Sequence, residues 1–196
     1  MRFWILLSLV ATAILSTAMP AAAAEKPVSR DGLLTMLKAQ QVWCSGWRDT
    51  DQSCEDIAFI DLLPDNKARQ VSRYRMSAAP NLEMVVRETV NIEGPGLCSV
   101  FRFDDLEIVV LVDDEPAPME QATSILAVLA QSMAHLEGKK SCETYVHDEA
   151  TGELKAHVTL DGEAAPEFDS TYRLIKPDTR ILLRPMFQDN EEPTAV

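Results

Sequence analysis

The sequence predicts an α+β fold in which two helices pack on antiparallel sheet. Two segments carry apolar residues at helical spacing, and most of the remaining chain alternates between apolar and polar residues as strands do. Turn residues separate these strand-like segments at short intervals. Two arrangements remain open. One is a duplicated helix-plus-strands unit with halves 29–112 and 113–187, and the other is a single curved antiparallel sheet that carries both helices.

The first 24 residues have the three parts of a cleavable export signal. Arg2 supplies a positive charge, residues 3–15 form an apolar run, and small residues follow and end in Ala22-Ala23-Ala24. The apolar run is shorter than the roughly 20 residues that a membrane-spanning helix needs. We therefore expect cleavage after Ala24, no membrane span in the mature chain, one α+β domain over 25–187 and a flexible acidic tail over 188–196.

The composition is strongly acidic, with 31 Asp and Glu residues against 18 Lys and Arg residues. The resulting formal net charge of −13 repels the phosphates of nucleic acids, which makes a nucleic-acid partner improbable. A high negative charge also favours solubility. The sequence therefore predicts an acidic protein that binds neither nucleic acid nor anionic lipid headgroups through general electrostatics.

Four cysteines are present, an even number that indicates two disulfides in an exported chain. Three pairings are possible. We favour Cys44–Cys54, which closes a short polar loop, and this leaves Cys98–Cys142 as the second bond. No C-x-x-C motif occurs, and the cysteine and histidine spacings do not match a zinc site. The cysteines therefore predict a periplasmic or secreted protein rather than a redox or metal centre.

Before residue 113 the sequence predicts one helix followed by strands. Ser29 or Asp31 caps a helix that runs to about Trp43. The segment 64–66, Pro-Asp-Asn, is a strong turn signal between two of the strands that follow. The predicted strands cover residues 54–63, 67–77, 82–92, 97–103 and 106–112.

After residue 113 a second helix and further strands are expected. Apolar residues at helical spacing over 116–137 predict the helix, and Gly138 is suited to end it. A hairpin is expected next, with a three-residue loop over 150–152. We expect this loop to place Cys142, Thr144 and Val146 on the same face as Leu154, Ala156 and Val158. The last predicted strands cover residues 171–175 and 180–183.

An arginine stripe is the most distinctive candidate binding feature. The stripe consists of Arg69, Arg73, Arg75 and Arg87. We expect these four side chains to lie on one face of two neighbouring strands. In an acidic protein such a stripe suits a carboxylate, a phosphate or an acidic partner, because guanidinium groups bind these in a bidentate manner. The alternative is a solvated face on which the arginines pair with Glu55, Glu83 or Glu88.

Two histidines are the best candidates for acid–base chemistry. In the expected hairpin, His157 lies opposite Tyr145 and beside His147 on the polar face. The sequence contains neither a G-x-S-x-G nor an H-E-x-x-H motif, so no nucleophile or metal accompanies them. We therefore predict no catalytic residue, no metal site and no cofactor.

The function that follows is an exported, disulfide-stabilised, non-catalytic envelope protein. It would act as a binding or accessory factor for another protein, and its partner would be an envelope protein or a small acidic ligand. One alternative is a small-molecule or lipid carrier with its cavity between helix 116–137 and the sheet. A second alternative is a hydrolase that uses His147 or His157.

Overall fold

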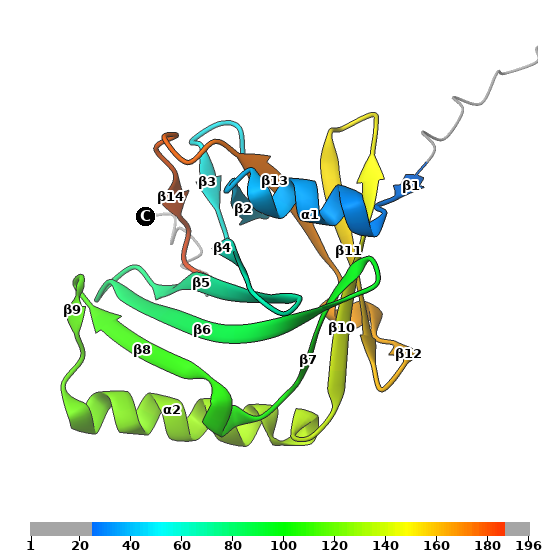
Figure 1. Ribbon diagram of the computed structural model, residues 1–196. Coiled ribbons are helices and arrows are strands. Elements are labelled where there is room, and N and C mark those ends of the chain that lie inside the picture. The colour runs from blue at the N-terminus through cyan, green and yellow to red at the C-terminus, as the bar shows by residue number, and fades with distance from the viewer. Residues whose placement is uncertain (1–24, 187–196) are drawn as a thin grey trace, which may run out of the picture.

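The protein, as a computed structural model, is described over residues 25–186 and consists mainly of strands (Figure 1). The predicted signal segment and the tail over 188–196 lie outside the described residues. Of the described residues, strands account for 51% and helices for 20%. Eight antiparallel strands close into a barrel. They are β2 (Val42–Ser45), β4 (Asp56–Leu63), β5 (Lys67–Ser77), β6 (Leu82–Glu93), β7 (Gly96–Val100), β10 (Lys140–Asp148), β11 (Glu153–Leu160) and β13 (Ser170–Ile175).

Closure of the sheet overturns the predicted α+β class. The strands follow one another around the barrel in the order β2, β4, β5, β6, β7, β10, β11 and β13, and β13 pairs again with β2. The prediction was wrong because two of these pairings join strands that are distant in sequence. β7 pairs with β10, and β2 pairs with β13, so no local pattern signals either contact.

The same two pairings place the two expected halves, 29–112 and 113–187, in one barrel. Each pairing joins a strand of the first half to a strand of the second, so neither half closes a sheet by itself. The two helices also have unlike positions. α1 (Arg30–Lys38) lies across one end of the barrel, whereas α2 (Met119–Met133) lies along β8, outside the barrel (Figure 1).

One end of the barrel is filled by α1 and by aromatic residues. Ser29 caps this helix by accepting a hydrogen bond from the Gly32 N–H at 3.1 Å. Leu33 and Leu37 project into the barrel and are fully buried beside Trp43. The helix ends at Lys38, earlier than predicted. Val42 and Trp43, at the end of the predicted helix, belong instead to β2, which is buried on both faces.

Two short strands extend the sheet beyond the barrel on the side of β6. The first part of β6 pairs with β8 (Glu107–Val112), and β8 pairs with β9 (Glu115–Pro116). Asp113 and Asp114 both have positive φ, 50° and 68°, as the two-residue turn between β8 and β9 requires. The chain then enters α2, which ends in a short 3₁₀ helix over Ala134–Leu136.

The remaining strands are short and tie the ends of the chain to the barrel. β1 (Glu25–Pro27) pairs with β10, and β12 (Glu163–Ala164) pairs with β11. β14 (Leu182–Leu183) runs parallel to β3 (Ser53–Cys54) in a separate two-stranded sheet. Among residues 25–186, no helix is long and apolar enough to cross a membrane.

Two disulfides join the same pairs that the spacing favoured. Cys44–Cys54 connects β2 to β3 across ten residues of sequence. Cys98–Cys142 connects β7 to β10 at directly opposed positions, where these two strands close the barrel. Both bonds are compatible with an oxidising, extracellular compartment.

The β10–β11 hairpin differs from the prediction by one residue of register. Asp148 pairs with Glu153, so the loop has four residues, 149–152, rather than three. The Asp148 carboxylate fixes this loop by accepting hydrogen bonds from the N–H groups of Ala150 and Thr151. A shift of one residue moves every side chain of a strand to the other face. Tyr145 is therefore buried inside the barrel rather than lying on the polar face.

Candidate functional site

An open apolar groove of about 580 Å³ lies between α2 and the sheet. Six of its nine lining residues are apolar, and the other three are serines. The lining residues are Met76, Ser77, Leu82, Met84, Ser124, Ile125, Val128, Leu129 and Ser132. A volume of this size lies within the roughly 300–1,000 Å³ range of small-molecule sites. Two flexible methionines on the sheet side allow the groove to adapt to its occupant.

The helix that forms one wall of this groove is apolar but poorly covered. All 15 residues of α2 are described, and none of them is buried. Val128, which lines the groove, has 69% of its surface exposed, and Met119 at the start of the helix is 85% exposed. Apolar helix surface that the fold leaves uncovered is a common mark of a binding site.

Polar side chains of the barrel strands follow the groove residue Met84 along one face of the sheet. Met84 on β6 lies directly opposite Tyr74 on β5, and Tyr74 lies directly opposite Asp56 on β4. Met76, which also lines the groove, lies in β5 two residues after Tyr74, at an irregularity in the pairing with β6 between Arg75 and Ser77. The apolar groove and the polar side chains of Tyr74 and Asp56 are therefore neighbours on one surface.

A group of carboxyl and phenol side chains, named the inner-wall cluster below, lines this part of the barrel interior. Its members are Asp56, Tyr74, Glu88, Glu143, Tyr145 and Tyr172. It includes all three tyrosines of the chain. The Tyr145 hydroxyl donates a hydrogen bond to Glu143 Oε2 at 3.0 Å. Trp43 packs edge-on against Tyr145 and Tyr172, with ring centroids 5.3 and 5.7 Å apart.

Burial shifts the titration of these carboxyl groups upward. Desolvation raises the pKa of Glu143 to about 7, a rise that the hydrogen bond from Tyr145 opposes. Desolvation likewise raises the pKa of Asp56 to about 6, and burial raises that of Glu88. The charges of Glu88 and Asp56 add to the rise at Glu143, so the three groups act on one another through the interior.

The tyrosines of the cluster are shifted in the same direction. Burial raises the pKa of Tyr74 to about 12, and the nearby Asp56 charge adds to the rise. Burial and the charge of Glu143 raise the pKa values of Tyr145 and Tyr172 further. All three phenols therefore stay neutral and keep a donor hydrogen at physiological pH.

The inner-wall cluster is not fully covered by protein atoms. Tyr74, Glu88, Glu143 and Tyr172 are half-buried, although their strand positions face the barrel interior. Around Trp43 the interior is closely packed: Leu154, directly opposite Tyr172, is 1% exposed, and Tyr145 is 2% exposed.

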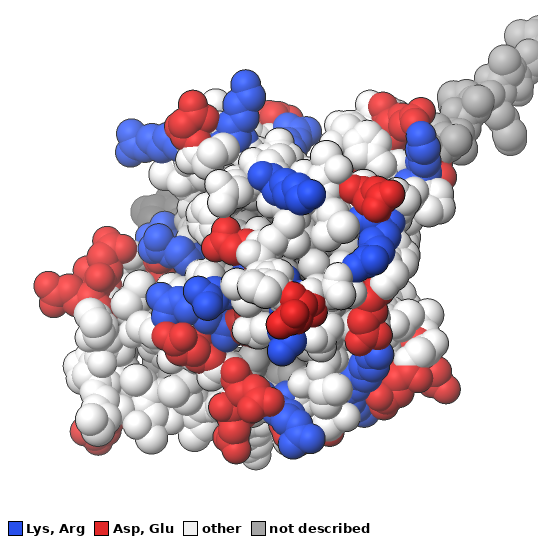
Figure 2. Space-filling model, in the orientation of Figure 1, with Lys and Arg blue, Asp and Glu red and all other residues white. Residues whose placement is uncertain are grey.

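The four predicted arginines share the outer face of β5 and β6, on the opposite side of the sheet from the groove. Figure 2 shows basic side chains gathered over these strands with acidic ones beside them. Arg73 pairs with the buried Glu83, and Arg87 pairs with Glu107 at 2.6 Å. Arg75 donates to the Leu183 carbonyl at 3.3 Å. The binding role of Arg69, Arg73, Arg75 and Arg87 stays a prediction.

The two candidate histidines do not come together. His157 pairs in register with Thr144, whereas His147 pairs with Leu154, so their side chains lie on opposite faces of the hairpin. His157 Nδ1 lies 2.8 Å from Asp169 Oδ2, and both side chains are partly exposed. The predicted grouping of His147, His157 and Tyr145 was wrong because the hairpin register differs by one residue.

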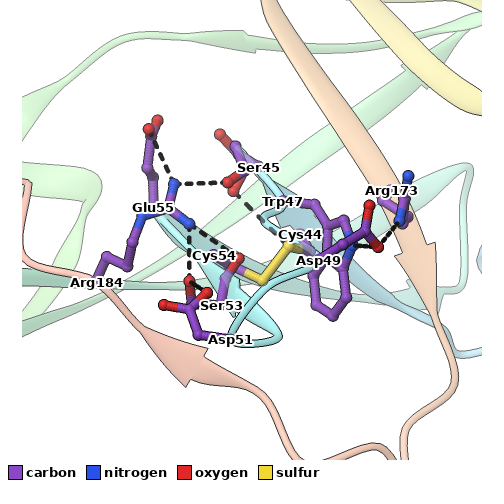
Figure 3. The surroundings of a disulfide bond; sticks show 11 residues. Cys44, Ser45, Trp47, Asp49, Asp51, Ser53, Cys54, Glu55, Arg173 and Arg184 are labelled. Carbon is purple, nitrogen blue, oxygen red and sulfur yellow. Dashed lines mark hydrogen bonds and ion pairs between the residues drawn. A yellow bond between two sulfur atoms is a disulfide. The ribbon is translucent and has the colours of Figure 1, made fainter.

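The loop around Cys44–Cys54 is a structural anchor (Figure 3). Arg184 donates to the carbonyls of Ser53 and Gly46 and to Glu55 Oε1, which holds the C-terminal segment against this loop. Each acidic residue of the loop has a partner of its own, and the Arg48–Asp51 pair is one example. Within residues 25–186, no three potential metal ligands come together.

Comparison of the chain with protein-family models, with curated proteins and with solved structures finds no match. The groove and the inner-wall cluster therefore carry the functional argument. A cavity between helix 116–137 and the sheet was one of the alternatives that the sequence left open, and the groove lies beside this helix. It missed the inner-wall cluster, because an isolated Glu or Tyr in an alternating strand normally points to solvent.

Proposed function

We propose that this chain is an exported, non-catalytic binding protein that holds a small apolar or amphipathic molecule between α2 and the sheet. The observation that carries the proposal is the groove of about 580 Å³ with six apolar residues in its lining. Barrels of eight strands commonly hold one small ligand.

A small ligand fits this site better than a protein partner. The exposed apolar surface of α2 is narrow, because among its large side chains only Met119 and Val128 are prominently exposed. A stable protein interface buries about 800 Å² on each partner and usually has an apolar centre. A concave groove with serines at its rim instead matches small-molecule sites, in which a few polar groups orient an apolar ligand.

Replacing Val128 with arginine tests the groove directly. Val128 lines the groove and is 69% exposed, so the substitution leaves the fold intact while placing a charge where the ligand lies. We expect V128R to bind a neutral fluorescent apolar probe at least about tenfold more weakly than the wild type, because burying an unpaired charge is costly. Fluorescence titration gives both dissociation constants.

Ala127 provides the matched control for this titration. It is the preceding residue of α2, is exposed and does not line the groove. We expect A127R to bind the probe as the wild type does. Equal weakening in A127R and V128R, or no binding by the wild type, would contradict the proposal.

The export part of the proposal makes a separate prediction. Expressed with its full N-terminus in a bacterium, the chain is expected to be recovered from the periplasm with Glu25 as its first residue. Its two disulfides, Cys44–Cys54 and Cys98–Cys142, lower the mass by four hydrogens relative to the reduced chain. Intact-mass spectrometry with and without reductant measures both the site of signal cleavage and the number of disulfides. A full-length or fully reduced product would contradict export.

A further inference from the structure

We propose a second binding site, in which a short peptide places its C-terminal residue in a wedge between β6 and the segment 99–106. This site lies outside the groove and does not depend on the function proposed above. Three observations support it, namely an interrupted strand ladder, two adjoining cavities at the interruption, and the arginines that line them.

The first observation is a gap in the pairing along one edge of β6. The ladder with β8 ends where Arg87 pairs with Glu107. The ladder with β7 begins four residues later, where Asn91 pairs with Cys98. Figure 1 shows β7 leaving β6 for β10, and the chain returning to β6 only at β8. Among residues 25–186, the strand positions 88–90 therefore face no neighbouring strand on this side.

The gap leaves one backbone donor and one backbone acceptor of β6 without a partner in the sheet. The backbone groups of successive residues in an antiparallel strand point to opposite neighbours. Asn81, directly before β6, accepts from the Asp113 N–H at 2.8 Å, so odd-numbered positions bond toward the side of β8 and β7. Thr89 is the odd-numbered residue in the gap, and its N–H and C=O therefore point into the wedge.

Two adjoining cavities occupy the wedge, with volumes of about 420 and 230 Å³. Thr89 lines both of them, and the segment from Ser99 to Arg102 lines the smaller one. The N–H and C=O of Thr89 match the C=O and N–H of one extended residue, which is the pattern of an added strand. Positions 87 and 91 lie about 13 Å apart along β6 and are both paired, so the occupant has room for one residue in the plane of the sheet.

A chain end fits this slot better than the middle of a chain. A continuous strand would meet β8 at one end of the slot and β7 at the other, because both pair with the same edge of β6. A C-terminal residue leaves the plane of the sheet at one end only. It also supplies both groups that Thr89 requires, an amide N–H for the carbonyl oxygen and a carboxylate oxygen for the N–H.

Arginines on two sides of the wedge are placed to bind the terminal carboxylate. Arg69 and Arg87 line the larger cavity, and Arg102 lines the smaller one. Arg87 is paired with Glu107 at 2.6 Å. No ion pair among residues 25–186 includes Arg69 or Arg102. A carboxylate accepts two parallel hydrogen bonds from such a guanidinium group, which suits the end of a peptide.

Acidic residues also line the cavities, and the balance of charge still favours a carboxylate. Glu107 is held by Arg87, as described above. Glu88 lies opposite Gln70, on the face of the sheet that points into the barrel and away from the Thr89 side chain. Asp105 is then the one carboxylate of the lining that opposes Arg69 and Arg102.

Three peptides that differ only at the C-terminal residue test this proposal on the whole exported protein. They are acetyl-trialanine with a free carboxylate, the same peptide as its C-terminal amide, and an analogue in which an ester oxygen replaces the last amide N–H. Isothermal titration gives the three dissociation constants. We expect the amide to bind about tenfold more weakly than the free acid, because it loses the charge-assisted bonds to arginine. The ester lacks the donor to the Thr89 carbonyl and is expected to bind roughly three- to tenfold more weakly.

Substitutions in the wedge identify where the peptide binds. Thr89→Pro removes the N–H that faces the wedge without removing a bond of either ladder, and we expect it to weaken binding of the free acid about tenfold. Thr89→Ala keeps the N–H and is expected to bind as the wild type does. Arg69→Gln and Arg102→Gln are each expected to weaken binding several-fold. Arg180→Gln removes an exposed charge elsewhere and is the matched control, with no expected effect. Circular dichroism establishes that each variant is folded.

These titrations are independent of the V128R titration, which tests the groove. No binding of the free acid, or equal binding of the acid and the amide, would overturn the proposal. Wild-type affinity in Thr89→Pro, or an equal loss in Thr89→Pro and Thr89→Ala, would overturn the role of the Thr89 backbone. If Thr89→Pro does not fold, the ester and the two arginine variants decide, and wild-type affinity in both Arg69→Gln and Arg102→Gln would overturn the site.

Discussion

Replacing both Cys98 and Cys142 with alanine is expected to lower the free energy of unfolding by about 4 kcal/mol. This disulfide closes a loop with a sequence separation of 44 residues, and longer loops restrict the unfolded chain more strongly. It also joins β7 to β10, the pair that closes the barrel. Urea unfolding followed by tryptophan fluorescence measures the change, since Trp43 lies in the core.

The second disulfide provides the comparison. Cys44–Cys54 has a sequence separation of ten residues, so its removal by a double alanine substitution is expected to cost about 3 kcal/mol. A smaller loss for the Cys98–Cys142 pair than for the Cys44–Cys54 pair would contradict the role of β7 in holding the barrel closed.

Stability is expected to fall as the pH rises from about 5 to about 8, and Glu143 is expected to be a main cause. Burial raises the pKa of Glu143 from 4.5 to about 7 and that of Asp56 from 3.8 to about 6. The folded state therefore binds more protons than the unfolded state in this range, and stability decreases with pH at up to about 1.4 kcal/mol per unit for each group. The free energy of unfolding that the raised pKa of Glu143 contributes at pH 5 is lost as Glu143 ionises.

Glu143→Gln isolates this contribution, because glutamine keeps the size and the acceptor oxygen without the charge. We expect the variant to match the wild type near pH 4.5 and to exceed it by on the order of 2 kcal/mol near pH 8. Urea unfolding at a series of pH values measures the difference. The exposed Glu149→Gln variant should follow the wild-type profile, and a Glu143→Gln variant less stable than the wild type at pH 8 would contradict the desolvation argument.

Local sequence patterns located most of the elements and missed the way they combine. The predicted strands over 67–77, 82–92 and 106–112 agree closely with β5, β6 and β8, because their turns carry residues suited to positive φ, such as Asp65 and Asn66. The barrel itself depends on the β7–β10 and β2–β13 pairings. These contacts depend on the whole chain, and a short, fully buried strand such as β2 shows no alternation that would separate it from the preceding helix.

The candidate site, too, was predictable from the sequence only in part. The apolar face of helix 116–137 was visible in its spacing, and the groove forms along that face. The inner-wall cluster was not visible, because the side of β10 that Glu143 and Tyr145 occupy depends on the loop to β11. A loop of four residues rather than three moved both side chains from the solvent to the interior.

Methyl NMR of the methionines tests the central claim, that a ligand lies between α2 and the sheet. Met76 and Met84 line the groove, whereas Met119, 85% exposed, does not line it and Met36 lies in α1 against the barrel core. With the methionine methyl groups labelled and decanol titrated in, the resonances of Met76 and Met84 are expected to shift and saturate together. Those of Met119 and Met36 are expected to stay in place. Unchanged Met76 and Met84 resonances, or shifts confined to Met119 and Met36, would contradict the account.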